Sequence, residues 1–333
     1  FGRALWVLDD IRPLRKMAAN KGAQFTNKLT VFTAPEAYQA TYKAATGYEW
    51  STMGLYDAEN RRRGAAVSYY ILPSKDTSAR AKLDSVQVRI YNEKNEVIRN
   101  LKWKADTGFN RQWWGMEERG VRNPGAPKPR PNAPEPSGMQ VFPGTYKVVI
   151  TGAGVSDSTM VTIKDDPRIE KSTEARLAQR RMVEGLRKST AKLTDAMDRL
   201  SEWEEVLGKM QGQLRGAEGK EVDSLRKRTS AMQDSIKKIR EFVSGARIER
   251  QGITRSSAIT VMNTIQTAQS YIMAKSIAPG AQEEALVKNA ESMISAAVKR
   301  VNQFYETTWK PYRQQAEATK VPLFKEYQPI EVY

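Results

Sequence analysis

The pattern of hydrophobic and polar residues changes along the chain, from a period of two in the first half to a helical period in the second. In the segment VQVRIY, Val86, Val88 and Ile90 alternate with more polar positions, which places three aliphatic side chains on one face of a strand. The polar run that follows supplies a turn, in which Asn95 can adopt a left-handed backbone conformation. The pattern predicts a β-hairpin.

Other segments of the first half carry the same signal. VSYYIL, residues 67–72, is a further predicted strand, and GTYKVVI leads through a glycine-containing bend at residues 151–154 into STMVTI. We therefore expect residues 21–168 to form an Ig-like or fibronectin-like antiparallel β-sandwich. Within it, residues 123–138 contain six prolines in sixteen positions, which predicts an exposed loop of polyproline character.

The second half predicts an antiparallel four-helix bundle over residues 169–318. The apolar stripe of its first helix is Met182, Leu186, Leu193, Met197, Leu200, Trp203, Leu207, Met210 and Leu214. The second helix has a heptad seam of Val222, Leu225, Thr229, Met232, Ile236, Ile239 and Val243. A glycine-containing turn joins these two helices, which together are expected to project as an arm.

Two more helices complete the predicted bundle. One spans about residues 256–276, with Ala258, Met262, Ile265, Ala268 and Ile272 facing inward, and its lack of charge predicts burial on more than one side. The last begins near Gln282 and is expected to end at Pro311, because proline interrupts a helix. Its stripe is Leu286, Ala290, Met293, Ala297, Val301 and Phe304.

The two ends of the chain are expected to be extended. The apolar run from Ala4 to Leu8 predicts a strand that needs a sheet to pair with, either in the following domain or in one that lies upstream. We assign residues 1–20 to the last strand and exit of an upstream β-propeller, and residues 319–333 to an apolar tail. The chain begins with Phe1 and shows no leader, which suggests a processed or truncated piece.

Composition narrows the possible chemistry. The 333 residues include no Cys and no His, which excludes Ser/His/Asp and Cys/His nucleophiles, thiolate or imidazole metal sites and disulfides. Adjacent acids such as Asp165 and Asp166 point to opposite faces of an extended backbone, so we expect no catalytic residues. Neither a metal site nor a cofactor is predicted, because glycine-rich phosphate loops and calcium loops are also missing from the sequence.

The net charge of +16 raises the question of nucleic acid. The basic excess is spread over both halves and interleaved with acids, which is typical of a solvated surface and argues against nucleic acid as a partner. The longest uncharged stretch, residues 256–274, is too polar for a transmembrane segment. An interaction surface for acidic protein partners is predicted on the second helix, at Arg226, Lys227, Arg228, Lys237 and Lys238.

Aromatic residues of the predicted sandwich indicate an alternative function, the binding of glycans. Trp113 and Trp114 are adjacent, so one of them points outward if the segment is a strand, and Tyr91 could extend a platform for glycans. The competing interpretation is that one tryptophan lies in the core while the other is covered. These three residues are the candidate ligand-binding site.

Three markers carry a family resemblance: GRALWVLDDIRPLR at the start, TGFNRQWWGMEERG followed by PGTYKVVI, and DDPRI before the helices. Together they resemble the C-terminal region of secreted sortilin-like, BNR-repeat β-propeller proteins of Bacteroidetes, often called glycosyl hydrolase BNR repeat proteins. The resemblance implies an extracellular, periplasmic or outer-membrane location. It also implies that any catalytic residues of the parent lie in propeller blades that this sequence lacks.

The sandwich segment also resembles the Ig-like domain of flagellar hook-capping proteins. Gly144 and Tyr146 fit its Gly-x-Tyr pattern, so Tyr146 is expected to point inward, whereas Trp114-Gly115 lacks the Asp of that pattern. The function expected from all these observations is a non-catalytic scaffold that docks protein partners, or further copies of itself, in a secreted or outer-membrane assembly. A carbohydrate-binding or glycosidase-associated protein is the first alternative, and a basic nucleic-acid-binding protein is the second.

Overall fold

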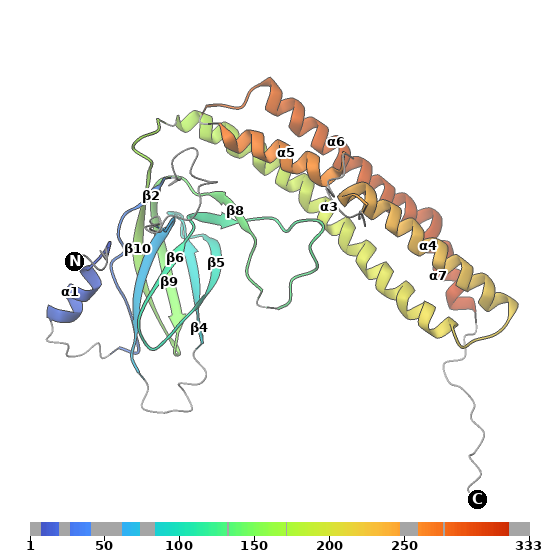
Figure 1. Ribbon diagram of the computed structural model, residues 1–333, viewed down its shortest axis with the longest axis horizontal. Coiled ribbons are helices and arrows are strands. Elements are labelled where there is room, and N and C mark those ends of the chain that lie inside the picture. Colours follow the sequence, from blue (N-terminus) through green and yellow to red (C-terminus); the bar gives the residue numbers. More distant parts are fainter. Residues whose placement is uncertain are drawn as a thin grey trace, which may run out of the picture. The chain divides into compact units, whose positions relative to one another are not determined.

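The computed structural model describes residues 8–19, 27–40, 62–73, 84–131, 133–170, 172–246, 259–275 and 277–319. These residues form two compact units. The first is drawn from Phe1–Gly120 and Arg130–Lys171, and the second from Val121–Pro129 and Ser172–Tyr333. The first unit holds the strands and the second the long helices (Figure 1), so the chain is an α+β protein, as predicted.

The strands of the first unit form two larger sheets and one pair. One sheet has the order β1-β3-β6, with β1 at Leu29–Val31, β3 at Ala65–Ile71 and β6 at Gly108–Trp114. The other has the order β2-β10-β9-β4-β5, with β2 at Ala37–Gln39, β10 at Val155–Asp165, β9 at Gly144–Gly152, β4 at Ser85–Tyr91 and β5 at Val97–Lys104. Strands β7 (Glu117–Arg119) and β8 (Ser137–Gln140) pair separately. All pairings are antiparallel except that of β2 with β10.

Both larger sheets contribute side chains to one core. Val86, Val88 and Ile90 are buried on β4, as their alternation predicts, and Val67, Tyr69 and Ile71 come from β3 of the other sheet. The two predicted hairpins, β4–β5 and β9–β10, are present, and Asn95 has the expected positive φ of 60° in the first turn. Tyr146 is buried as predicted and packs edge-on against Trp114, with ring centroids 5.4 Å apart.

A short helix near the start of the chain was not predicted. Helix α1 (Arg12–Ala19) follows Asp10, whose carboxylate accepts hydrogen bonds from the backbone N–H and the guanidinium of Arg12. Pro13 in the first turn is compatible with a helix, because no intrahelical partner exists there for a backbone N–H. Most of the expected strand Ala4–Leu8 and the tail after residue 319 lie outside the described residues.

Four helices of the second unit run side by side (Figure 1): α3 (Thr173–Leu214), α4 (Lys220–Ser244), α5 (Val261–Ala274) and α6 (Ala281–Phe304). Ser172 caps α3, and its hydroxyl accepts a hydrogen bond from the backbone N–H of Ala175. The seam predicted for α4 is confirmed, since all seven of its positions are buried. Its residues share one hydrophobic core with α3, α5 and α6.

The prediction that the last helix ends at Pro311 is wrong. After α6 the chain forms a π-helical segment, η2 (Tyr305–Trp309), and continues as α7 (Lys310–Ala318). The π segment widens the helix just before Pro311. Pro311 is the second residue of α7, an early helical position at which the missing backbone N–H of proline is tolerated. Trp309 consequently stacks on Trp203 of α3, with ring centroids 5.2 Å apart, and the continuing helix places Tyr312 in the core.

Candidate interaction site

Large apolar side chains are exposed at the end of α5. Tyr271 and Met273 flank the buried Ile272, and Ile277 follows in the connection to α6 with 67% of its surface exposed. We use the name α5–α6 surface for the end of α5 and its connection to α6, where Ile277 is exposed; Tyr271 and Met273, two positions apart, point to different sides of the helix. The expectation that this uncharged helix is buried on more than one side is therefore wrong, because only one stripe of α5 faces the core.

The connection between α5 and α6 is held by polar contacts within the helical unit. The side-chain amide of Gln179, on α3, donates to the carbonyl oxygens of Lys275 at 2.7 Å and Ile277 at 3.2 Å. Lys275 extends its ammonium to the carboxylate of Glu283, at 2.8 Å from Oε2. That oxygen also accepts the backbone N–H of Gly280 at 2.8 Å. Both sides of Ile277 are thus fixed to neighbouring helices.

Glu283 is central to this arrangement. It lies in the first turn of α6, where a carboxylate interacts favourably with the helix dipole. The hydrogen bond from Lys275, followed by that from the backbone of Gly280, lowers the pKa of Glu283 below its usual value. A charged Glu283 therefore stabilises the connection that presents Ile277. An exposed apolar side chain on a fixed backbone suits protein contact, because little conformational freedom is lost on binding.

The structure does not assemble the predicted aromatic platform. Trp114 is fully buried, and its indole N–H donates to the carbonyl oxygen of Glu117 at 2.8 Å, so the proposal that it holds a ligand does not fit its position. Trp113 points to the other face of β6, where the guanidinium of Arg62 lies 4.3 Å from its ring centroid. Tyr91 is half-buried at the end of β4, in the other sheet.

The five basic residues predicted as an interaction surface differ in their surroundings. The guanidinium of Arg226 donates to the carbonyl oxygens of Leu214 and Ala217, and so satisfies backbone groups at the end of α3. Arg228 donates to the side chain of Gln315, on α7, at 2.6 Å. Lys227, Lys237 and Lys238 are exposed. Arg226 and Arg228 therefore stabilise the helical unit, and the three exposed lysines are accessible to a partner.

Two acidic side chains of the first unit have polar partners within that unit. Asp166 is buried and binds the guanidinium of Arg168, with 2.7 Å between Oδ2 and Nη2. Glu135 accepts hydrogen bonds from the backbone and side chain of Asn100 at 2.8 Å. No group of three or more acidic side chains within the described ranges is arranged to hold a metal ion.

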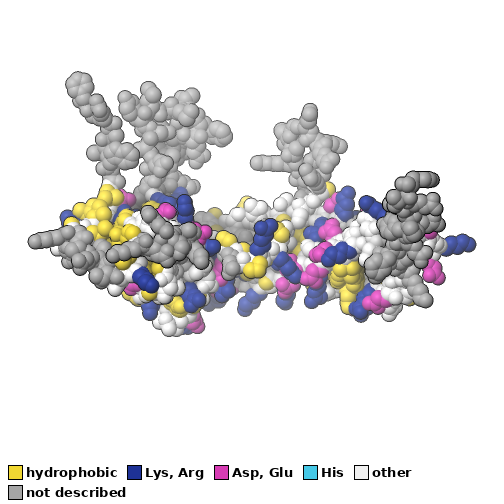
Figure 2. All heavy atoms as spheres, turned by 90° about the horizontal axis from the view of Figure 1, so that it is seen from below, with side chains coloured by type: hydrophobic (Ala, Val, Ile, Leu, Met, Phe, Trp, Pro, Cys, Tyr) yellow, Lys and Arg dark blue, Asp and Glu magenta, His cyan; other side chains and the backbone are white. Residues whose placement is uncertain are grey.

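Charge is mixed on the visible surface of the helices. Figure 2 shows Lys and Arg side chains interspersed with Asp and Glu along them, which agrees with the dispersed charge of the sequence. None of the helices in the described part of the chain combines the length and apolar character needed to cross a membrane.

Sequence reasoning missed the α5–α6 surface for identifiable reasons. The absence of charge over residues 256–274 pointed to α5, but the same signal fits burial as well as protein contact. Nothing in the sequence pairs Gln179 with Lys275, since the two residues are 96 positions apart.

Comparison with known proteins found no matching family model, no matching curated protein and no matching solved structure.

Proposed function

We propose that this chain is a non-catalytic docking module, whose helical unit binds a protein partner through the α5–α6 surface. The observation that carries the proposal is Ile277, which is two-thirds exposed while the carbonyl groups at Lys275 and Ile277 accept hydrogen bonds from Gln179. Exposed apolar side chains cost free energy in water unless a partner covers them, and buried aromatic or aliphatic anchors dominate protein interfaces.

The proposal includes the finer architecture. We assign the first unit to the Ig-like sandwiches and the second to the antiparallel four-helix bundles extended by α7. Tyr146 supports the first assignment, because its hydroxyl donates to the carbonyl oxygen of Phe142 at 2.7 Å. A tyrosine hydroxyl that donates to a backbone carbonyl a few residues upstream is typical of the tyrosine corner of Ig-like domains. The common core of α3 to α6 supports the second assignment.

The family resemblance gives the proposed setting. The three sequence markers support a place in a secreted, periplasmic or outer-membrane assembly, next to an upstream propeller. The exposed lysines Lys227, Lys237 and Lys238 would aid encounter with an acidic partner, since dispersed surface charge affects the rate of association more than its strength.

The proposal is tested by the size of the native assembly. Tagged wild-type chain, Ile277→Glu and Met160→Glu are expressed in the cells that naturally produce the protein and compared by native size-exclusion chromatography. Met160, on β10, is a matched control because it is 53% exposed and lies in the other unit. We expect wild type and Met160→Glu to elute in a larger assembly, and Ile277→Glu to elute alone. Elution of all three as the free chain would contradict the proposal.

A further inference from the structure

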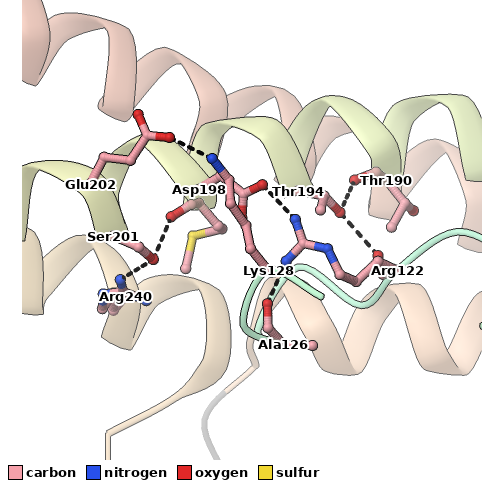
Figure 3. Close-up of polar contacts among 10 residues, drawn as sticks. Arg122, Ala126, Lys128, Thr190, Thr194, Asp198, Ser201, Glu202 and Arg240 are labelled. Carbon is pink, nitrogen blue, oxygen red and sulfur yellow. Dashed lines mark hydrogen bonds and ion pairs between the residues drawn. The ribbon is translucent and has the colours of Figure 1, made fainter. Parts of the chain in front are cut away.

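Part of the proline-rich segment lies on the helical unit. Residues 121–129, which we call the clasp, contact α3 along a row of side chains spaced four residues apart: Thr194, Asp198 and Glu202 (Figure 3). Residues with this spacing share one face of a helix. We call these three residues the α3 ridge.

Arg122 is the anchor of the clasp. Its Nη2 lies 2.5 Å from Oδ2 of Asp198, and both side chains are less than one-fifth exposed. Its Nη1 donates to the carbonyl oxygen of Ala126, which shapes the clasp itself. The backbone carbonyl oxygen of Arg122 lies 3.0 Å from the hydroxyl of Thr194, which shares its single hydrogen between that oxygen and the carbonyl oxygen of Thr190, also at 3.0 Å. The ridge therefore binds both the side chain and the backbone of one residue.

A second ion pair joins the clasp to the ridge at its outer end. Nζ of Lys128 lies 2.5 Å from Oε1 of Glu202, and both side chains are more than half exposed. The hydrogen bond to Glu202 raises the pKa of Lys128. An exposed pair of this kind adds little stability and is screened by salt, so the contacts of Arg122 are the stronger ones.

The chemistry that the ridge recognises is general. The ridge binds the side chain of an arginine, the backbone carbonyl of that arginine and, six residues later, the side chain of a lysine. Prolines at positions 124, 127 and 129 of the segment have no backbone N–H to donate. None of these contacts requires the segment to belong to the same chain. Tethering only raises its local concentration, which keeps a weakly bound segment in place.

We propose that the α3 ridge is a binding site for basic, proline-containing segments, filled in cis by the clasp, so that a partner segment of the same chemistry can displace it. This inference concerns a different surface from the α5–α6 surface, so either proposal can fail without the other.

The first test measures opening of the clasp in the full chain. Arg122→Gln and Asp198→Asn each remove the anchoring ion pair, whereas Arg130→Gln removes the same charge from the neighbouring loop and serves as the control. By NMR we expect amide exchange at Ala126 to become roughly tenfold faster in the first two variants and to stay unchanged in the control, with equal far-UV circular dichroism. Unchanged exchange in both anchoring variants would overturn the proposal.

The second test asks whether the ridge accepts a segment in trans. A fluorescent peptide with the sequence of residues 120–131 is titrated into wild type, Arg122→Gln and Arg122→Gln/Asp198→Asn, with anisotropy as the readout. We expect binding to Arg122→Gln at least fivefold tighter than to wild type, where the clasp competes, weakening with salt and lost in the double variant. Equal binding to all three chains, or no binding to Arg122→Gln, would refute the site.

Discussion

The hydroxyl groups of Thr229, on α4, and Tyr312, on α7, lie 2.9 Å apart in the helical core, where both residues are buried. Thr229 also donates to the carbonyl oxygen of Leu225, one turn earlier. Since a threonine hydroxyl carries a single hydrogen, Tyr312 is the donor in the bond between them. Thr229, the polar position in the heptad seam of α4, therefore accepts a hydrogen bond from Tyr312 and joins α4 to α7.

This donor assignment predicts unequal effects of the two single substitutions. Thr229→Val leaves the buried Tyr312 hydroxyl without its acceptor and should lower the free energy of unfolding by about 1–3 kcal/mol. Tyr312→Phe leaves Thr229 bonded to Leu225, and its cost should be smaller, about 0.5–1.5 kcal/mol. Urea unfolding followed by circular dichroism measures both. A double variant whose cost equals the sum of the two would contradict the pairing.

The two neighbouring tryptophans of β6 should differ strongly in their contribution to stability. Trp114→Ala removes a fully buried ring and should destabilise the sheet unit by about 3–5 kcal/mol. Trp113→Ala is the matched control, expected to cost less than about 1 kcal/mol because its side chain lies outside the core. Denaturant midpoints of the sheet unit, followed by the NMR signals of its buried core residues such as Val88 and Ile150, would decide. Equal costs would place both rings in the same environment and contradict the fold.

Stability of the sheet unit should fall at alkaline pH because of Tyr69. Burial, with a smaller effect of Asp106, raises the pKa of Tyr69 to about 12. The unfolded chain, with an ordinary pKa near 10, loses this proton first, so the stability that Tyr69 contributes is present below pH 10 and is lost as the pH rises toward 12.

Urea midpoints between pH 9 and 11.5 test this dependence. Tyr69→Phe should lose less stability over that range than wild type does, whereas Tyr271→Phe, an exposed tyrosine of the helical unit, should follow wild type. Identical pH profiles for Tyr69→Phe and wild type would show that Tyr69 titrates normally.

Acid should weaken the α5–α6 connection through Glu283. Because the folded pKa of this carboxyl is lowered, its stabilising effect is present above the unfolded value of 4.5 and is lost as the pH falls through the folded value. Glu283→Gln should therefore melt at a lower temperature than wild type at pH 7, with the gap narrowing at pH 3. Glu284→Gln, an exposed neighbour, is the control. A gap that stays constant with pH would contradict this role.

Regular periodicity made much of the fold predictable. The seam of α4 and the alternation of Val86, Val88 and Ile90 are each repeated several times, so a single interrupted position does not hide the pattern. Helix α1 was missed because its eight residues bury only Pro13 and so give no comparable periodic signal. The continuation of the last helix through Pro311 depends on a π segment that sequence spacing does not reveal.

The candidate sites were less predictable, because they depend on contacts between distant residues. Arg122 and Asp198 are 76 positions apart, and the proline-rich composition of residues 123–138 indicates an exposed loop without saying which unit receives it. Basic residues on α4 were visible in the sequence, but only the structure shows that Arg226 binds backbone carbonyl groups at the end of α3. Composition identifies charged residues; it does not identify their partners.

Site-specific photo-crosslinking tests the docking account most directly. A photoreactive phenylalanine analogue replaces Ile277 in one chain and Met160 in another, and both are irradiated in the cells that naturally produce the protein. If Ile277 docks a protein partner, position 277 crosslinks to one defined protein and position 160 does not. Recovery of the same proteins from both positions, or of none from position 277, would contradict docking through Ile277.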